Sequence, residues 1–426
     1  MTTRPPGSFG EVVAQARAAG QIVVQPRMGF SDPQTMHAGL TAVRQADATT
    51  IATITVDSYT RVNDLPAADK ALAAGVALNG YPIATYPAGT TRDLVAETVA
   101  VGVPVQVRHG SARPEHIIRA LTAAGLHATE GGPISYCLPY GRVPVRDSVH
   151  EWARSSELLV ELCRENGQEA HLETFGGCMM GQLCPPSLLV AISTLEALFF
   201  RQHGLRSISL SYAQQTDADQ DTEAVLAMRR LIAELLPEVE SHVVVYSYMG
   251  VYPLTDDGAT RLLQESARLT ARTGAARLIV KTTAEAFRIP TIAENVIALE
   301  TAAAAAGPVL TPDPLVDSET YAEARALVDA VLDLDDDLGT ALISAFQRGY
   351  LDVPYCLHPD NAGRSTGQVD SDGRLRWTRA GSMPIKTTGP AQRRTTAPDL
   401  LDSLTYVRRT YDRPQLAKVA DHQEHR

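Results

Sequence analysis

The chain has 426 residues, of which 44% are hydrophobic and 20% charged, and it carries a formal net charge of −11. This composition is typical of a folded globular protein, and an acidic chain without a Lys/Arg-rich segment is not expected to bind nucleic acid. No apolar run approaches the ~20 residues that span a bilayer and the first ten residues form no signal segment, so we expect a cytoplasmic protein without a membrane partner.

Short β-branched apolar runs recur along the first two thirds of the chain, each followed by a polar turn and a helical pattern. This alternation predicts repeated strand–helix units. A barrel of such units has eight strand positions, so one of the predicted runs must be misread. The runs are Ile22–Gln25, Ile51–Val56, Val76–Leu78, Val103–Val107, Leu126–Thr129, Ala170–Glu173, Ser207–Leu210, His242–Tyr246 and Leu278–Val280.

The segments between these runs contain apolar residues at three- and four-residue spacing, which predicts helices. Strands that alternate with helices form a parallel sheet, either closed as a barrel or open and doubly wound. No Gly-x-Gly-x-x-Gly follows the first strand, which disfavours a dinucleotide-binding domain. We therefore expect an α/β protein with a TIM-type (β/α)8 barrel. The clearest helices are Val149–Arg164, Ser187–Gln202, Asp221–Leu236 and Gly258–Thr273.

After Ala302 the pattern changes to helices without strands, at Ser318–Leu332 and Leu338–Arg348, and then to a Gly/Pro/Asp-rich stretch over 354–388. This pattern predicts a C-terminal helical and irregular extension. The expected organisation is an N-terminal lead-in at 1–20, a barrel with the substrate and cofactor site at 21–305, an extension packed on the barrel at 306–412, and a frayed polar tail at 413–426.

Three arginines directly follow predicted strands: Arg27, Arg61 and Arg108. The active site of a (β/α)8 barrel forms at the carboxyl ends of its strands, so we expect these side chains to face one another. Guanidinium groups bind carboxylate oxygens through two parallel hydrogen bonds, and three of them suit a small dianion. The alternative is that each arginine pairs with a nearby acid at the rim.

Other polar residues occupy the same relative place, among them Glu130 and Lys281. Glu130 precedes Gly131 and Gly132, a pair that would let the backbone approach a ligand, and its carboxylate could bind an ammonium group or act as a base. A simple turn is the alternative. His109 is a candidate base or donor, although a lone histidine is more often structural.

The sequence lacks several common catalytic motifs. The sequence contains no Gly-x-Ser-x-Gly, no P-loop and no His-Glu-x-x-His. Its 5 cysteines include no Cys-x-x-Cys pair, so neither a disulfide framework nor a bound metal is expected. A cofactor that supplies the chemistry fits this pattern.

Several strings, in order and spacing, resemble the catalytic subunit of glutamate (methylaspartate) mutase along most of the chain. They include Gln-Pro-Arg-Met-Gly at 25–29, Asp-Ser-Tyr-Thr-Arg at 57–61, Val-Arg-His-Gly at 107–110, Glu-Gly-Gly-Pro-Ile-Ser-Tyr-Cys-Leu-Pro-Tyr at 130–140 and Val-Lys-Thr-Thr-Ala-Glu-Ala at 280–286.

The resemblance implies a role for each matching residue. The substrate-binding set is Arg27, Arg61, Arg108, His109, Glu130, Tyr136 and Tyr140, with Glu130 as the catalytic base. The adenosylcobalamin-binding set is Gly29, Asn79, Pro139, Tyr252, Lys281, Glu285 and Ile289.

The resemblance also implies the reaction, a reversible radical rearrangement of L-glutamate to (2S,3S)-3-methylaspartate that depends on adenosylcobalamin. No Asp-x-His-x-x-Gly is present, so a separate cobalamin-binding small subunit is expected to share the cofactor, with a homodimer of this chain inside a heterotetramer. Two alternatives stay open: a cobalamin-independent barrel lyase or isomerase acting on a small amino dicarboxylate, and a non-catalytic binding subunit.

Overall fold

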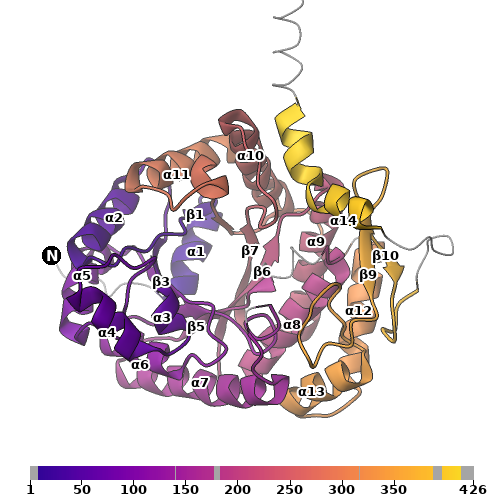
Figure 1. Ribbon diagram of the computed structural model, residues 1–426, viewed down its shortest axis with the longest axis horizontal. Helices are drawn as coiled ribbons and strands as arrows, with labels where there is room; N and C mark the ends of the chain where they lie inside the picture. Colours follow the sequence, from indigo (N-terminus) through magenta and orange to yellow (C-terminus); the bar gives the residue numbers. More distant parts are fainter. Residues whose placement is uncertain (1–7, 140, 177–182, 316, 387–395, 414–426) are drawn as a thin grey trace, which may run out of the picture.

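The computed structural model describes residues 8–139, 141–176, 183–315, 317–386 and 396–413. Eight parallel strands form one sheet in the order β1, β8, β7, β6, β5, β4, β3, β2. The sheet closes because Val24 of β1 pairs in parallel with Thr50, which lies just before β2. The predicted TIM-type barrel is confirmed (Figure 1). The strands are β1 (Val23–Gln25), β2 (Ala52–Thr55), β3 (Val105–Arg108), β4 (Ala128–Glu130), β5 (His171–Glu173), β6 (Ser207–Ala213), β7 (Glu240–Tyr246) and β8 (Arg277–Ile279).

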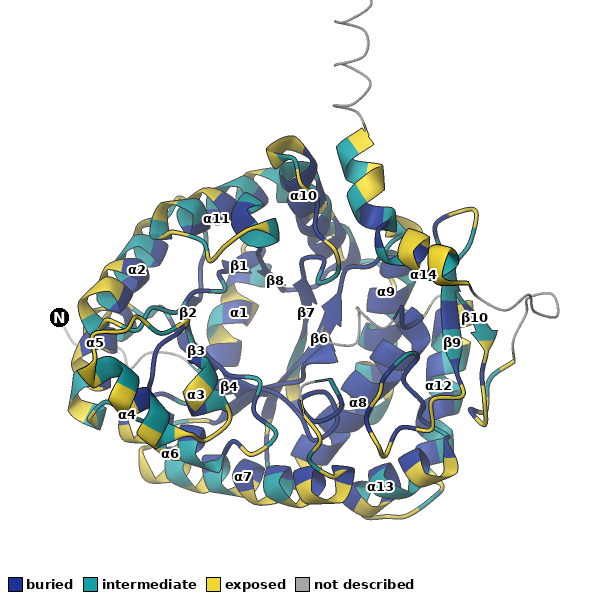
Figure 2. Ribbon diagram, in the orientation of Figure 1, coloured by how far each residue is buried: buried dark blue, intermediate teal, exposed yellow. Residues whose placement is uncertain are grey.

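Helices surround the barrel because each strand is apolar on its outer face and must be covered. Figure 2 shows the buried strands inside a ring of helices with exposed outer faces. The helix between β5 and β6, α8, is buried along almost its whole length, which explains its continuous apolar sequence. The surrounding helices are α2 (Pro33–Gln45), α5 (Ala88–Ala100), α6 (Glu115–Ala123), α7 (Val145–Glu165), α8 (Pro186–Gln202), α9 (Ala218–Leu235), α10 (Asp256–Thr273) and α11 (Ile292–Ala306).

The run Val76–Leu78 is the misread strand. It is irregular in the structure, and Val76 is 54% exposed. Two short helices, α3 (Ser58–Arg61) and α4 (Leu65–Ala73), precede it, and Gly75 ends α4 with a positive φ of 70°. The buried Tyr81 instead makes the parallel bridge to Val56. Three apolar residues after a helix therefore form part of a turn, not a strand.

Helix α1 (Phe9–Ala18) closes the amino-terminal end of the barrel. In Figure 1 it lies within the ring of strands. The Phe9 ring stacks on His171 of β5 with 4.1 Å between centroids, and the Arg277 guanidinium of β8 lies 5.1 Å from the centroid of the same ring. Because α1 fills the amino-terminal end, a binding or active site is expected at the carboxyl end of the barrel.

The C-terminal part contains α12 (Glu319–Leu332), α13 (Leu338–Arg348) and α14 (Ala397–Leu404). It also contains an antiparallel hairpin of β9 (Thr366–Val369) and β10 (Leu375–Arg379) that the sequence analysis missed. Trp377 of the hairpin donates a hydrogen bond of 3.1 Å to Ser187 of α8, which ties this region to the barrel.

The division of the chain into four parts stays a prediction, and residues 414–426 of the predicted tail lie outside the described residues. Among the helices that the structure describes, none is both long and apolar enough to cross a membrane.

Candidate active site

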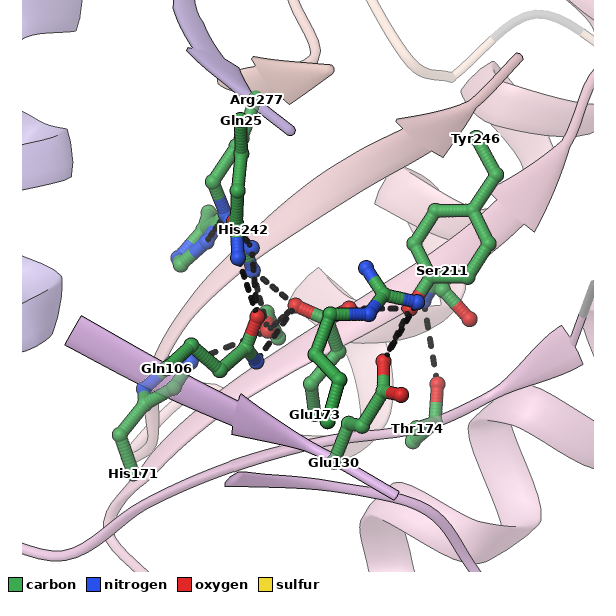
Figure 3. A network of polar contacts seen from close by, with 12 residues as sticks. Gln25, Gln106, Glu130, His171, Glu173, Thr174, Ser211, His242, Tyr246 and Arg277 are labelled. Carbon is green, nitrogen blue, oxygen red and sulfur yellow. Dashed lines mark hydrogen bonds and ion pairs between the residues drawn. The ribbon is translucent and has the colours of Figure 1, made fainter. Parts of the chain in front are cut away.

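A buried polar network fills the middle of the barrel (Figure 3). Arg277 of β8 pairs with Glu173 of β5 and donates to Gln25 of β1. Gln25 in turn donates to Gln106 of β3 at 2.7 Å. A buried ion pair needs such surrounding hydrogen bonds to offset the cost of desolvation. Burial opposes ionisation of Glu173, but the Arg277 and Arg108 guanidiniums outweigh it and lower the pKa of this carboxyl.

Glu130, the last residue of β4, lies beside Glu173 of β5 in this network and is almost completely buried. It accepts hydrogen bonds from the Tyr136 hydroxyl and, at 3.1 Å, from the Tyr246 hydroxyl. The Tyr246 hydroxyl also contacts Glu173, so one phenol lies between two carboxylates. Burial raises the pKa of Glu130, and the Arg108 guanidinium only partly opposes this shift. A carboxylate with a raised pKa is suited to accept a proton or to hold an ammonium group.

Arg108 ends β3 and lies 2.7 Å from Glu130 through its Nη2 atom. Its guanidinium packs over the Tyr246 ring, 4.9 Å from the centroid. Its Nη1 atom is buried and has no hydrogen-bond partner among the described residues. A buried guanidinium N–H without an acceptor is costly, so this atom marks a place for an external acceptor such as a ligand carboxylate.

His109 offers a second donor beside Arg108. Burial lowers the pKa of this imidazole to about 3, so the ring is neutral near pH 7. Its Nδ1 atom accepts a 2.9 Å hydrogen bond from the Ser111 backbone N–H, which assigns the ring proton to Nε2. That Nε2–H is buried and unpaired within the described part of the chain. The ring stacks on Trp152 at 5.9 Å, which fixes the direction of the donor.

Arg61 stands at the end of α3, beside a cavity of ≈ 310 Å³. The Tyr136 side chain lines the same cavity, together with Gly110 and Val143. Because the Tyr136 hydroxyl reaches Glu130, the structure connects Arg61 to the cluster of Arg108, His109 and Glu130 through this cavity and its tyrosine. Five of the seven predicted substrate residues therefore meet in one region.

Arg27 lies apart from this cluster in its contacts and is linked to the cofactor set instead. Its Nη1 atom is 2.9 Å from Oε1 of Glu285, and the Lys281 ammonium is 3.1 Å from the same oxygen. Lys281 is buried, which lowers its pKa to about 8. The loops that follow β1 and β8 are thus joined by one carboxylate.

Two residues next to Lys281, one in space and one in the chain, carry buried hydroxyls without partners in the described part of the chain. The Lys281 ammonium lies 5.2 Å from the centroid of the Tyr252 ring. The hydroxyls of Tyr252 and Thr282 are buried and make no hydrogen bond within the described residues. Hydroxyl groups in this state fit a polar ligand that supplies donors and acceptors.

The remaining predicted residues make other contacts. A Cβ atom added to Gly29 would overlap the Thr55 carbonyl, so this glycine allows the loop after β1 to pack on β2. Asn79 accepts a 2.9 Å hydrogen bond from the Ser58 N–H at the start of α3. Pro139 is half-buried in the turn after Glu130, and Ile289 is 60% exposed at the rim. Tyr140 lies outside the described residues.

The sequence analysis missed Tyr246 as a site residue, and it named Glu173 only by its place at a strand end. Tyr246 is the last residue of a strand that was predicted correctly, so the rule that selected Arg108 and Glu130 also selects Tyr246. Tyr246 was predicted only as the last residue of the run His242–Tyr246, and its hydroxyl contacts both carboxylates in the structure.

Comparisons with known proteins identify the family of the chain. The glutamate mutase epsilon subunit of Escherichia coli O157:H7 is 29% identical over 396 residues, which cover 88% of this chain and 81% of that protein. The glutamate mutase epsilon subunit of Halobacterium salinarum is 30% identical over 394 residues, with 89% and 81% covered. Among solved structures, the YdjI aldolase from Escherichia coli K12 is 12% identical with a TM-score of 0.36, covering 70% of this chain and 94% of that one, and this likeness carries no functional argument. The profile described as methylaspartate mutase E chain matches residues 5–396, and the chain belongs to this family of isomerases.

Proposed function

We propose that this chain binds L-glutamate at the carboxyl end of the barrel and interconverts it with (2S,3S)-3-methylaspartate in a radical reaction that depends on adenosylcobalamin. The observation that carries the proposal is a pair of neighbouring buried donors without acceptors, Arg108 Nη1 and His109 Nε2–H, next to the carboxylate of Glu130. Unpaired donors beside a buried acid complement a ligand that carries both carboxylates and an ammonium group.

The proposed roles follow from this complementarity. Arg108 and His109 hold one substrate carboxylate, and Arg61 approaches from the cavity beside Tyr136. Glu130 faces the substrate amino group and exchanges a proton with it, helped by the Tyr136 hydroxyl. The full proposed substrate set is Arg27, Arg61, Arg108, His109, Glu130, Tyr136 and Tyr140.

The residues around Lys281 fit an adenosyl group. A buried cation, an acid bound to it and two unpaired hydroxyls, those of Tyr252 and Thr282, can satisfy the ring nitrogens and ribose hydroxyls of such a ligand. The proposed cofactor set is Gly29, Asn79, Pro139, Tyr252, Lys281, Glu285 and Ile289.

When bound, adenosylcobalamin supplies the carbon-centred radical that starts a rearrangement of this kind. The part of this chain is to bind the charged groups of the substrate, to hold them in register and to exclude water. The arginines suit this task because they stay protonated at any working pH and fix each carboxylate without giving up a proton.

We further propose that a separate small subunit would bind the cobalamin together with this chain, in a heterotetramer built on a homodimer of this chain. The name epsilon subunit, which the relatives carry, supports a multi-subunit enzyme. The absence of Asp-x-His-x-x-Gly from the sequence supports a separate cobalamin-binding chain.

An omission series tests the proposal. The purified chain is mixed with L-glutamate, adenosylcobalamin and the small subunit of a relative such as the Escherichia coli O157:H7 enzyme, and glutamate consumption is measured with each component left out in turn. We expect turnover only in the complete mixture. Turnover that persists without adenosylcobalamin would instead support the cobalamin-independent lyase or isomerase.

A further inference from the structure

The turn that follows Glu130 is held by a carboxylate from a distant part of the chain. Glu196, in the middle of α8, is fully buried. Its Oε1 atom accepts hydrogen bonds of 2.9 Å from the backbone N–H groups of Ile134 and of Ser135. These N–H groups lie at the start of the turn that carries Tyr136, so Glu196 binds this turn as a capping residue binds the start of a helix.

The glycine pair before the turn makes room for this arrangement. A Cβ atom added to Gly132 would overlap the Glu196 carboxylate. Gly131 has a φ of 140°, and a Cβ atom there would overlap the Trp152 ring. The close approach that the glycines permit is therefore to Glu196 and Trp152, whereas the sequence analysis expected an approach to a ligand.

Glu196 also reaches the neighbouring strand end. Burial raises the pKa of its carboxyl to about 7, and hydrogen bonds from Ser135, from Ile134 and from the Phe175 backbone oppose the shift. Phe175 follows β5, and its ring lies 4.9 Å from the Tyr136 ring. One carboxylate thus contacts both segments that pack around Tyr136.

We propose that Glu196 is a positioning residue, which sets the Tyr136 hydroxyl on Glu130 by holding the turn between them. Tyr136 comes directly after the bound N–H of Ser135, and its own N–H donates to Gly132, so a shift of the turn moves its ring. No hydrogen bond or ion pair joins Glu196 to Glu130 among the described residues, so in this proposal Glu196 acts on Glu130 through the turn that carries Tyr136. The kinetic consequence rests on the proposed mutase function.

A double-mutant cycle between Glu196 and Tyr136 tests this inference. In Glu196→Gln the amide oxygen can still accept both N–H groups, so we expect kcat/KM of the complete enzyme within a few fold of the wild type. Glu196→Leu leaves the two N–H groups buried and unpaired, and we expect a fall on the order of 10- to 100-fold in kcat/KM. In a Tyr136→Phe background the same change should lower kcat/KM by less than about threefold.

Asp221 provides a matched control. It is also buried, and burial raises its pKa to about 7. It accepts hydrogen bonds from the Tyr212 hydroxyl of β6 and from the Gln215 N–H after this strand. Asp221→Leu is expected to lower kcat/KM by the same factor with and without Tyr136→Phe. If the fold of Glu196→Leu fails by circular dichroism, the cycle is run with Glu196→Asp, which withdraws the acceptor by one methylene.

The dissociation constant for L-glutamate, measured by calorimetry on the same complexes, gives a second readout that does not depend on turnover. We expect Glu196 and Tyr136 to be coupled in this constant too. Equal losses in both Tyr136 backgrounds would overturn the positioning role and leave Glu196 a stability residue. A wild-type enzyme that neither binds nor converts glutamate would instead overturn the proposed function.

Discussion

The guanidinium of Arg27 lies 2.9 Å from the carboxylate of Glu285, and this ion pair joins the loops after the first and last strands of the barrel. The two residues are proposed to serve different ligands, Arg27 the substrate and Glu285 the cofactor. Lys281 contacts the same oxygen, so a single carboxylate links residues of the two proposed sets.

Replacing Lys281 or Glu285 with alanine tests the cofactor half of the proposal. Each change leaves the other partner less well paired, and we expect the concentration of adenosylcobalamin needed for half-maximal activity to rise about tenfold. Lys281→Ala leaves Arg108, His109, Glu130 and the pair of Arg27 with Glu285 in place, so the dissociation constant for L-glutamate should change by less than about threefold in this variant. Arg288→Ala, which breaks an exposed ion pair with Glu294 in the same region, is the control and should change neither value. Unchanged cofactor dependence in both alanine variants would remove these residues from the site.

Arg108→Lys keeps the positive charge but loses the planar guanidinium group. In the wild type, one nitrogen of this group contacts Glu130, and another is unpaired among the described residues and available to a substrate carboxylate. We expect kcat/KM for L-glutamate to fall by about 10²- to 10³-fold, since loss of a buried charged contact typically costs ~2–5 kcal/mol. Circular dichroism should show an intact fold. The control is Arg119→Lys, an exposed arginine that pairs with Glu115 on α6, and it should stay within about twofold. Near-normal kinetics in Arg108→Lys would reject the assignment.

His109 should make the protein sensitive to acid. Its pKa in the folded protein is about 3, below the ordinary histidine value of 6.5, so between these two pH values the unfolded chain binds a proton and the folded chain does not. The stability from neutral His109 is present above pH 6.5 and is lost as the pH falls toward 3. Between pH 6.5 and pH 4 the free energy of unfolding of the wild type should fall by about 3 kcal/mol more than that of His109→Phe. Parallel curves from urea unfolding would show that this histidine is not buried as a neutral ring.

Gly132→Ala tests the close approach between the turn and Glu196. The added methyl group would overlap the carboxylate, and we expect a loss of about 1–3 kcal/mol in the free energy of unfolding. Gly89→Ala near the start of α5 is the control, because a Cβ there meets open space and alanine favours a helix. That variant should gain about 0.5–1 kcal/mol. A neutral Gly132→Ala variant would mean that the turn is free to move away from Glu196.

The barrel could be predicted because each strand carries its own β-branched signal, and eight of the nine predicted runs overlap the observed strands. The hairpin of β9 and β10 was missed because its Gly-rich, polar sequence resembles an irregular loop. Val76–Leu78 was misread because three residues are too few to distinguish a strand from a turn.

The contacts within the site were harder to predict from the sequence than the residues at the strand ends. The order of the strands places Arg108 and Glu130 at one mouth, and that much follows from the fold. The contact of Glu196 with the turn could not be predicted, because Glu196 comes from the middle of an apolar helix, 61 residues beyond Ser135. The ion pair of Arg27 with Glu285 joins residues 258 positions apart, so no local sequence pattern predicts it.

The product of the complete reaction tests the central claim most directly. Proton NMR is used to follow L-glutamate in the presence of this chain, adenosylcobalamin and a small cobalamin-binding subunit. A rearranged skeleton carries a methyl group on carbon 3, so the account predicts a new methyl doublet that grows as glutamate is consumed and reaches an equilibrium ratio from either direction. Glutamate consumption without a methyl doublet, or no reaction in the complete mixture, would contradict it.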